Sequence, residues 1–245
     1  MTSENGRPVA VVTGASRGLG SVVANFLAGS GYDLVATARA SSPLHEAARP
    51  WERLGATVVP VSAAVEDSAG RAAIQSAVHT LGRLDVVVHN ASELGPSGRP
   101  KLLALSPDQL ETVLRVNVVA PVLLTKALLP PLKAAPAALV VNITSDAAVG
   151  AYPGWGAYGA SKAALDLVTR TLAQELADDH VSVVAVDPGD MRTAMHQAAY
   201  LGEDISDRPL PEVTVPFWAW LFGQSPARVN GLRFQAQGER WEANP

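Results

Sequence analysis

Short apolar runs alternate with helical stretches along this chain, and this alternation restricts the fold more than any other feature of the sequence. The stretches with helical periodicity are Ser21–Leu27, Pro43–Leu54, Asp67–Leu81, Ser106 to about Leu129, and Gly159–Leu176. Alternation of this kind predicts an α/β fold, a doubly wound parallel sheet with helices on both faces. The runs that read as buried strands are Pro8–Thr13, Asp33–Thr37, Thr57–Val61, Leu84–Val88, Leu139–Ile143, Val181–Val186 and Leu232–Ala236.

A glycine-rich turn lies between the first strand and the first helix. It reads Gly14-Ala15-Ser16-Arg17-Gly18-Leu19-Gly20. Small residues let a backbone approach a pyrophosphate closely, and a helix N-terminus presents free N–H groups to it. The glycine spacing differs from the standard dinucleotide fingerprint, but its place between a strand and a helix predicts a Rossmann-like nucleotide site.

The end of the second strand bears on the choice of nucleotide. An NAD-binding unit usually has a carboxylate here for the ribose 2′-hydroxyl, whereas this chain has Ala38 and then Arg39. Arg39 and Arg17 could together hold a 2′-phosphate by charge-assisted hydrogen bonds. The alternative is that both are solvated surface charges. Because the carboxylate is missing, NADP is favoured over NAD.

The helix that begins at Ser106 has clear predicted ends. Ser106 is a good N-cap, Pro107 suits the first helical position, and Gln109 can complete a capping box. Pro130-Pro131 is expected to end the helix near Leu129.

Within the same helix, Pro121 stands four residues after Asn117. A proline has no N–H for the carbonyl four residues before it, and its ring pushes that carbonyl aside. The sequence therefore predicts a kink near Asn117.

No shift in composition marks a domain boundary, so residues 1–245 are predicted to form one Rossmann-like domain. The stretch 190–216 is interrupted by Pro209, Pro211 and Pro216 and reads as an irregular loop at the ligand edge. A long loop at such an edge is usually a lid over the substrate. The aromatic segment Phe217–Phe222 after it is expected to be packed core or a subunit interface.

Composition restricts the partners and the location. The net charge is −4 without a long basic run, which argues against nucleic acid or an anionic membrane surface as a partner. There is no cysteine, and no cluster of metal-binding residues is visible, so no metal is expected. Met1–Arg7 lacks a signal-peptide core, and no apolar run reaches the roughly 20 residues of a membrane span. A cytoplasmic location is therefore expected.

The most reactive pair in the sequence is Tyr158 and Lys162, which stand four residues apart on a predicted helix. Side chains at that spacing lie one above the other on the same helix face. A nearby ammonium favours the phenolate, so Lys162 is expected to lower the pKa of Tyr158 toward the range useful for proton transfer. Ser145 follows the fifth strand, at the sheet edge where ligands of such folds bind.

These pieces together resemble the short-chain dehydrogenase/reductase family over nearly the whole chain, from about Pro8 to the last strand. The matching residues are Thr13 to Gly20, Asn90-Ala91, Asn117, Ser145, Tyr158 with Lys162, and Pro188-Gly189 with Thr193. The resemblance implies Tyr158 as general acid/base and Ser145 as the hydroxyl that polarises the carbonyl. It also implies that Lys162 binds the nicotinamide ribose, that Asn117 holds a proton-relay water, and that Thr193 meets the nicotinamide carboxamide.

The expected cofactor contacts follow from the same resemblance, together with Arg39. They are Gly14, Ser16, Arg17, Gly18, Leu19, Gly20, Arg39, Val65, Asn90, Ala91, Tyr158, Lys162, Pro188, Gly189 and Thr193. Two positions depart from the family pattern: His89-Asn90-Ala91-Ser92 stands where Asn-Asn-Ala-Gly is usual, and Ala64 stands where an aspartate often contacts adenine. His89 has no visible partner in sequence and is expected to be structural.

The expected function is an NADP(H)-dependent oxidoreductase acting on a small carbonyl or alcohol. The alternative is a catalytically silent protein that senses a dinucleotide, although such a protein would not need Asn117, Ser145, Tyr158 and Lys162 together. Apolar and aromatic residues near the site suggest an apolar or aromatic substrate, or equally ordinary packing: Met191, Met195, Tyr200, Leu201, Tyr152 and Trp155. His196 is expected to be a surface residue rather than a contact to the substrate.

Self-association is also expected. The helices around Val119, Ala163 and Leu167 carry more apolar residues than one sheet-facing stripe needs. The resemblance implies that these two helices pair across a two-fold axis, giving a homodimer or homotetramer.

Overall fold

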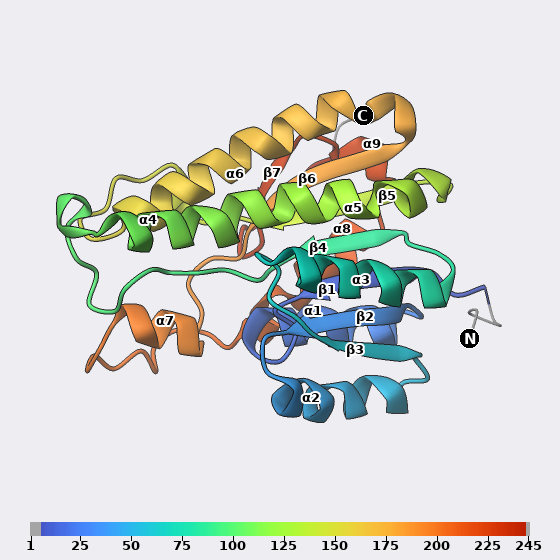
Figure 1. Cartoon of the computed structure of the whole chain (residues 1–245), viewed down its shortest axis with the longest axis horizontal. Helices are drawn as coiled ribbons and strands as arrows, with labels where there is room; N and C mark the ends of the chain where they lie inside the picture. The colour runs from blue at the N-terminus through green and yellow to red at the C-terminus, as the bar shows by residue number, and fades with distance from the viewer. Residues whose placement is uncertain (1–5, 244–245) are drawn as a thin grey trace.

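The seven predicted strands form one parallel sheet in the computed structural model, which describes residues 6–243 (Figure 1). The strand order is β3-β2-β1-β4-β5-β6-β7, and every neighbouring pair is parallel. The order reverses direction between β1 and β4, which places a ligand crevice beyond the carboxyl ends of these two strands. The strands are β1 (Val9–Thr13), β2 (Asp33–Ala38), β3 (Val58–Ser62), β4 (Val86–His89), β5 (Ala138–Ile143), β6 (Val181–Asp187) and β7 (Arg233–Gln235).

Helices cover both faces of the sheet, because each parallel pair needs a crossover. One buried apolar cluster joins the sheet to α1, α2 and α8, and a second joins the opposite face to α3, α5 and α6. Figure 1 shows α5 and α6 over the second face, where α6 contacts α4. The helices named here are α1 (Gly18–Gly29), α2 (Ser41–Arg53), α3 (Ser68–Leu81), α4 (Pro107–Leu114), α5 (Ala120–Ala134), α6 (Gly156–Glu175), α7 (Ala194–Ala199) and α8 (Val215–Phe222). The predicted doubly wound α/β fold is confirmed.

The helical stretch from α4 to α5 differs from the sequence prediction at its end. The capping box at Ser106 is formed, but Pro130 and Pro131 lie inside α5, so the expected stop near Leu129 is wrong. Pro131 cannot donate to the carbonyl of Ala127, and Gln75 Nε2 from α3 bonds that carbonyl instead, at 2.9 Å. An outside donor therefore lets the helix continue for its last turn.

Around Asn117, where the sequence predicts a kink, the structure has a π-helical turn, Arg115–Val119, between α4 and α5. The N–H of Ala120 bonds the carbonyl of Arg115, five residues back. Pro121 follows directly, so the wider turn occurs where the proline removes a regular helical hydrogen bond.

The same stretch, Pro107–Ala134, is the one helix in the described part of the chain that is long and apolar enough to cross a membrane. Length and composition alone are weak evidence for a span, because the core helix of a globular protein passes the same test. Here 44% of its most apolar window is buried inside the protein. Leu124, Leu128 and Leu132 pack against the sheet, which accounts for the apolar composition.

The sequence predicts an irregular loop over 190–216, but the structure contains helices there. This stretch contains α7 and a short 3₁₀ helix, Pro211–Thr214, which leads directly into α8. Thr193 caps α7 by accepting a hydrogen bond from the N–H of His196 at 3.2 Å. This cap satisfies one of the free N–H groups at the start of the six-residue helix.

The aromatic segment of α8 is packed core, as predicted. Phe217, Trp218 and Leu221 are fully buried. Trp218 donates its indole N–H to Thr214 Oγ1 at 2.9 Å, so its single polar group is satisfied inside the core.

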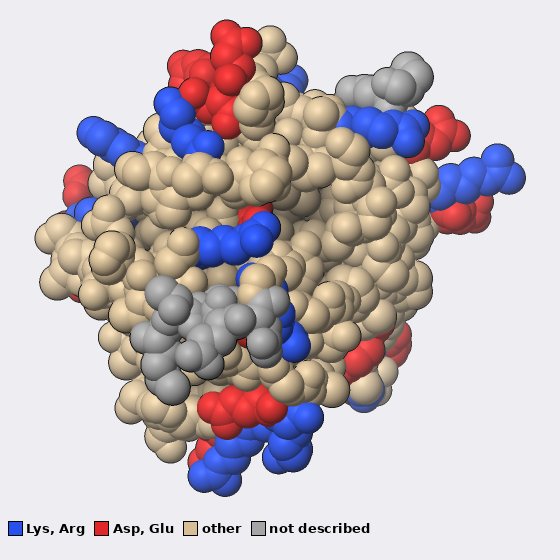
Figure 2. Space-filling view, turned by 90° about the vertical axis from the view of Figure 1, so that its right-hand side faces the viewer, with Lys and Arg blue, Asp and Glu red and all other residues tan. Residues whose placement is uncertain are grey.

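Charged side chains of both signs are interspersed on the face shown in Figure 2. That face shows no continuous basic surface of the kind that follows a nucleic-acid backbone.

His89, at the end of β4, is buried, and its Nε2 lies 2.8 Å from Thr125 Oγ1 of α5. Burial lowers the pKa of His89 to about 3. This contact supports the structural role expected for His89.

We predict that His89 makes the fold sensitive to acid. Below the unfolded pKa of about 6.5, the unfolded chain binds a proton at this site while the folded chain does not. Each pH unit between about 6.5 and 3 then costs roughly 1.4 kcal/mol of stability. Urea unfolding at pH 7 and pH 5 should show a loss about 2 kcal/mol larger for the native chain than for His89→Gln, whose amide can still bond Thr125. Equal losses for the two proteins would contradict this assignment.

Candidate active site

A cavity of about 1150 Å³ opens at the carboxyl edge of the sheet. It runs from the glycine-rich turn after β1 to the start of α6, and loops that follow β1, β2, β4, β5 and β6 line it. The size and position suit an extended ligand with one end at the turn and the other at α6.

The glycine-rich turn has the conformation that the sequence suggests. Gly14 and Gly18 have φ angles of +67° and +57°, which favour glycine. A Cβ on Gly20 would lie 2.3 Å from the carbonyl oxygen of Gly14, so no side chain fits there. No described side chain caps the start of α1 at Gly18, and its first N–H groups can meet an anion.

The side chain of Asn90 fixes this turn by hydrogen bonds to its backbone. Its Nδ2 donates to the carbonyls of Thr13 and Gly14 at 2.8 and 3.2 Å. Thr13 Oγ1 in turn accepts the backbone N–H groups of Asn90 and Ala91, both at 2.9 Å. These bonds tie the end of β4 to the end of β1 and fix the shape of the turn.

Tyr158, in the first turn of α6, stands at the other end of the cavity with Lys162 and Ser145. The Lys162 Nζ lies 5.5 Å from the centre of the Tyr158 ring and donates to the carbonyl of Ile143 at 2.8 Å. Ser145 Oγ donates to Asp146 Oδ1 at 2.9 Å and accepts the N–H of Ala147 at 3.2 Å. Tyr158, Lys162 and Ser145, which the sequence analysis selected, thus lie at the same end of the cavity.

The electrostatics of this trio differ from the prediction. Burial raises the pKa of Tyr158 to about 12, although hydrogen bonding with the Ser145 and Ser92 side chains lowers it in part. Burial also lowers the pKa of Lys162 to about 8, with Asp166 acting in the opposite direction. The prediction of a lowered pKa for Tyr158 is therefore wrong. Desolvation of the phenol raises this pKa and is the largest effect on it.

Asn117 lies under the site and, unlike the other three predicted catalytic residues, is not part of the cavity lining. Its Nδ2 donates to the Glu93 carbonyl at 2.8 Å and to Ser161 Oγ at 2.9 Å. Its Oδ1 accepts the Glu93 N–H at 2.8 Å and the Ser92 hydroxyl at 3.1 Å. The side chain joins the loop after β4 to α6.

The geometry agrees with comparisons with known proteins. The family model described as short chain dehydrogenase matches residues 8–204. The chain belongs to the short-chain dehydrogenase/reductase family. As a member of that family it is an oxidoreductase with a Rossmann-type nucleotide site.

Individual family members match along almost the whole chain. The uncharacterized oxidoreductase YciK of Escherichia coli K12 is 32% identical over 237 residues, covering 95% of this chain and 92% of that protein. A short chain dehydrogenase from Pseudomonas syringae has a TM-score of 0.88 at 34% identity, with 94% of each chain covered. A short chain dehydrogenase from Shigella flexneri complexed with NADP has a TM-score of 0.83 at 31% identity, covering 94% of this chain and 97% of that one.

The remaining cofactor candidates of this short-chain dehydrogenase lie around the same cavity, with the exception of Gly20, which packs behind the turn. Arg17 and Arg39 are exposed at its rim, and Arg39 Nη1 lies 4.0 Å from Glu93 Oε2. The candidates that line the cavity are Gly14, Ser16, Arg17, Gly18, Leu19, Arg39, Val65, Asn90, Ala91, Tyr158, Lys162, Pro188, Gly189 and Thr193.

An aromatic wall adjoins Tyr158 on the side of residues 190–216. Trp155 meets the Tyr158 ring edge-on at 5.7 Å and lies 6.3 Å from Tyr200. His196 stacks on Tyr200 at 4.7 Å, and the Arg99 guanidinium lies 4.3 Å from the centre of the same ring. These residues pack on one another and also line the cavity.

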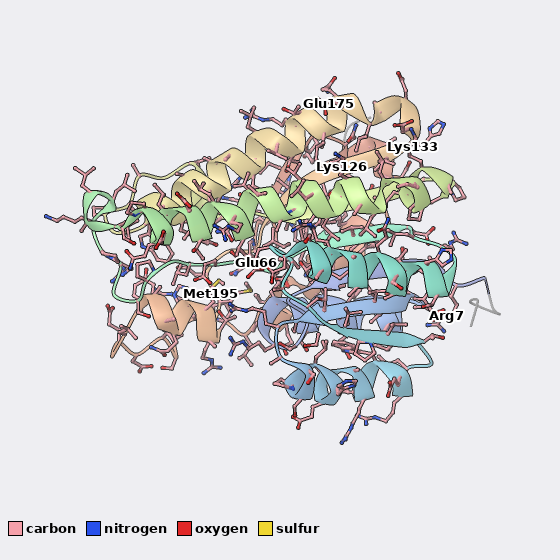
Figure 3. The ribbon with its side chains drawn as sticks, in the orientation of Figure 1. Arg7, Glu66, Lys126, Lys133, Glu175 and Met195 are labelled. Atoms are coloured by element: carbon pink, nitrogen blue, oxygen red, sulfur yellow. The ribbon has the colours of Figure 1, made fainter. Side chains whose placement is uncertain are left out.

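Other residues suggested for substrate contact divide into two groups. Met195 of α7 lines the cavity, and Figure 3 labels its side chain. Glu66 after β3, also labelled there, lines the cavity too, although the sequence did not suggest it. Tyr152 and Met191 line it too, whereas Leu201 does not and is 60% exposed. The prediction that His196 is a surface residue is wrong, because its side chain lines the cavity. Its Nε2 is buried and has no hydrogen-bond partner among the described groups.

Sequence reasoning missed Ser92 and Arg233 as site residues. Ser92 was noted only as a departure from the family pattern, yet its hydroxyl bonds Asn117 and acts on Tyr158. Arg233 begins β7 and donates to the backbone carbonyl of Ser145 at 2.9 Å. No signal in sequence could have joined two residues that stand 88 positions apart.

Proposed function

We propose that this protein is an NADP(H)-dependent oxidoreductase that transfers a hydride between the nicotinamide and a carbonyl or alcohol substrate, with Tyr158 as general acid/base. One observation carries the proposal: Tyr158, Ser145 and Lys162 line the same cavity as the glycine-rich turn. The small-molecule substrate would lie between Tyr158 and the aromatic wall of Trp155, Tyr200 and His196.

The chain's own residues suit a nicotinamide dinucleotide. The turn at Gly14 and Gly18 and the uncapped start of α1 would hold the pyrophosphate, and Pro188, Gly189 and Thr193 would hold the nicotinamide end. When bound, this cofactor supplies or accepts the hydride.

The side chains of the protein would handle the proton transfer. Because the pKa of Tyr158 is raised to about 12, its phenol keeps its proton at neutral pH and can donate it to an oxygen that gains negative charge. Ser145 would hold the same oxygen by a hydrogen bond. Lys162 would bind the nicotinamide ribose, and Asn117 would serve a proton-relay water while it fastens Ser92 and Glu93.

NADP is the proposed cofactor in preference to NAD. The cavity rim at the end of β2 carries Ala38 and Arg39 rather than a carboxylate, and Arg17 is exposed on the same rim. The NADP complex of the Shigella flexneri relative supports this choice. A 2′-phosphate would compete with Glu93 for Arg39, whose side chain is 70% exposed.

Three further features belong to the proposal. The segment 190–216 would act as a lid, since it supplies His196 and Tyr200 to the cavity. The chain would act in the cytoplasm on a small molecule, without a nucleic-acid or membrane partner and without a metal. It would form a homodimer or homotetramer through α5 and α6.

The phenol of Tyr158 is tested by Tyr158→Phe, which removes only the hydroxyl. Turnover of a carbonyl compound with NADPH should fall by roughly a hundredfold or more, while NADPH still binds. The matched control is Tyr32→Phe, because Tyr32 lies outside the cavity lining. Near-normal turnover in Tyr158→Phe would show that another group is the acid. If the native chain reduces or oxidises none of a panel of carbonyl and alcohol compounds, the alternative of a catalytically silent dinucleotide sensor is favoured.

For the cofactor, fluorescence titration should give NADPH an affinity about tenfold to a hundredfold higher than NADH, as one charge-assisted contact would supply. Arg39→Ala should remove most of this difference. Arg53→Ala is the control, because Arg53 is an exposed arginine outside the cavity lining. Equal affinities of the native chain for both nucleotides would refute the preference.

For assembly, light scattering should show a dimer or tetramer at micromolar concentration. Val119, just before α5, and Leu167 of α6 are 46% and 58% exposed, and Ala163 is exposed one turn before Leu167, so both helical stretches present apolar surface. Leu167→Glu should produce monomers, because it places a charge in that surface. Leu54→Glu, at another exposed leucine (48%), should not. A monomeric native protein would refute the assembly.

A further inference from the structure

Arg233 stands at the start of β7, beyond residues 8–204 that match the family model. Its guanidinium donates to three acceptors: the Ser145 carbonyl at 2.9 Å, Asp187 Oδ2 at 3.1 Å and Asp166 Oδ2 at 3.1 Å. The side chain is only 26% exposed, so these bonds form in a partly desolvated place where they are strong.

Each acceptor belongs to a different part of the site. Ser145 lies in the loop between β5 and α6, and Asp187 ends β6. Asp166 lies on α6, eight residues after Tyr158. One planar guanidinium therefore connects the proposed carbonyl-binding loop, the proposed nicotinamide-binding loop and the helix that carries Tyr158.

A second side chain after β7 acts on the same β6 loop. Gln237 Nε2 donates to the carbonyls of Pro188 and Asp190 at 2.9 and 3.0 Å. Asp187 Oδ1 also accepts the Gly189 N–H at 3.0 Å. The loop is thus held on one side by Gln237 and on the other by Asp187, whose second oxygen is held by Arg233.

The charges explain why an arginine is needed. Asp187 is 3% exposed, and burial raises the pKa of its carboxyl, while the Gly189 N–H and Arg233 act in the opposite direction. Without Arg233 a buried carboxylate would lose its cation and the Ser145 carbonyl would lose a donor. A lysine ammonium is a point charge and cannot reproduce the forked geometry.

We propose that Arg233 is a positioning residue for the reaction, which fixes the Ser145 hydroxyl and the Gly189 loop relative to Tyr158. This inference rests on the proposed oxidoreductase function. It adds a residue from the last strand of the sheet to the group that determines turnover, although Arg233 does not itself line the main cavity.

The experiment compares Arg233→Gln with Arg83→Gln in the full-length protein. Arg83 forms a similar ion pair, with two bonds of 2.7 Å to Asp85, but Asp85 precedes β4 and so lies at the opposite edge of the sheet. Both variants lose an arginine–aspartate pair and should lose stability. Turnover at saturating NADPH is measured on a carbonyl compound that the native chain reduces, and is divided by the folded fraction from circular dichroism.

Arg233→Gln should lower the corrected kcat by about tenfold to a hundredfold, since small misplacements of reacting groups have effects of this size. Arg83→Gln should leave it unchanged. Arg233→Lys should recover only part of the loss, and provides a second variant if the glutamine protein folds poorly. If the corrected kcat of Arg233→Gln and Arg233→Lys stays within about twofold of that of Arg83→Gln, the role of Arg233 is structural and the proposal fails.

A double-mutant cycle with Ser145→Ala tests the route of the effect. If Arg233 acts through Ser145, adding Arg233→Gln to Ser145→Ala should cost much less than it does alone. Fully additive losses would overturn the proposal. A native chain without turnover on any carbonyl or alcohol would instead refute the proposed function, so the two failures are distinguishable.

Discussion

Parallel pairing of all seven strands is the constraint on which the rest of this structure depends. It brings the carboxyl end of every strand to one edge, and it requires helical crossovers that bury both faces of the sheet. The reversal of order between β1 and β4 then leaves a crevice at that edge. Residues as far apart in sequence as Gly14, Ser145 and Gly189 come to line one cavity because their strands end there.

The loops at this edge are held by side chains that bond backbone groups of neighbouring loops. Asn90 secures the glycine-rich turn, Asn117 secures the loop after β4, and Arg233 and Gln237 secure the loops after β5 and β6. Buried backbone groups need partners, and regular strand pairing no longer supplies them beyond the strand ends. The same polar residues therefore stabilise the fold and set the geometry of the site.

Burial also governs the chemistry at this edge. It raises the pKa of Tyr158 and lowers the pKa of Lys162, so the phenol keeps its proton while the ammonium loses its own more readily. Spacing on a helix predicts correctly that the two side chains are neighbours, but the lower pKa of Tyr158 expected from it is wrong. The direction of the pKa shift of Tyr158 depends on how much protein surrounds it, which no spacing reveals.

Sequence alone determined the seven strands, most of the long helices, the sheet type, the glycine-rich turn and the set Ser145, Tyr158 and Lys162, because periodicity, turn chemistry and motif spacing are local properties. Tertiary structure decided what depends on distant partners. Gln75 bonds the carbonyl that Pro131 leaves free in α5, Thr193 caps α7 within a predicted loop, and His196 stacks on Tyr200 beside the cavity. Arg233 reaches Ser145 for the same reason: β7 pairs with β6, and that pairing is a property of the folded sheet.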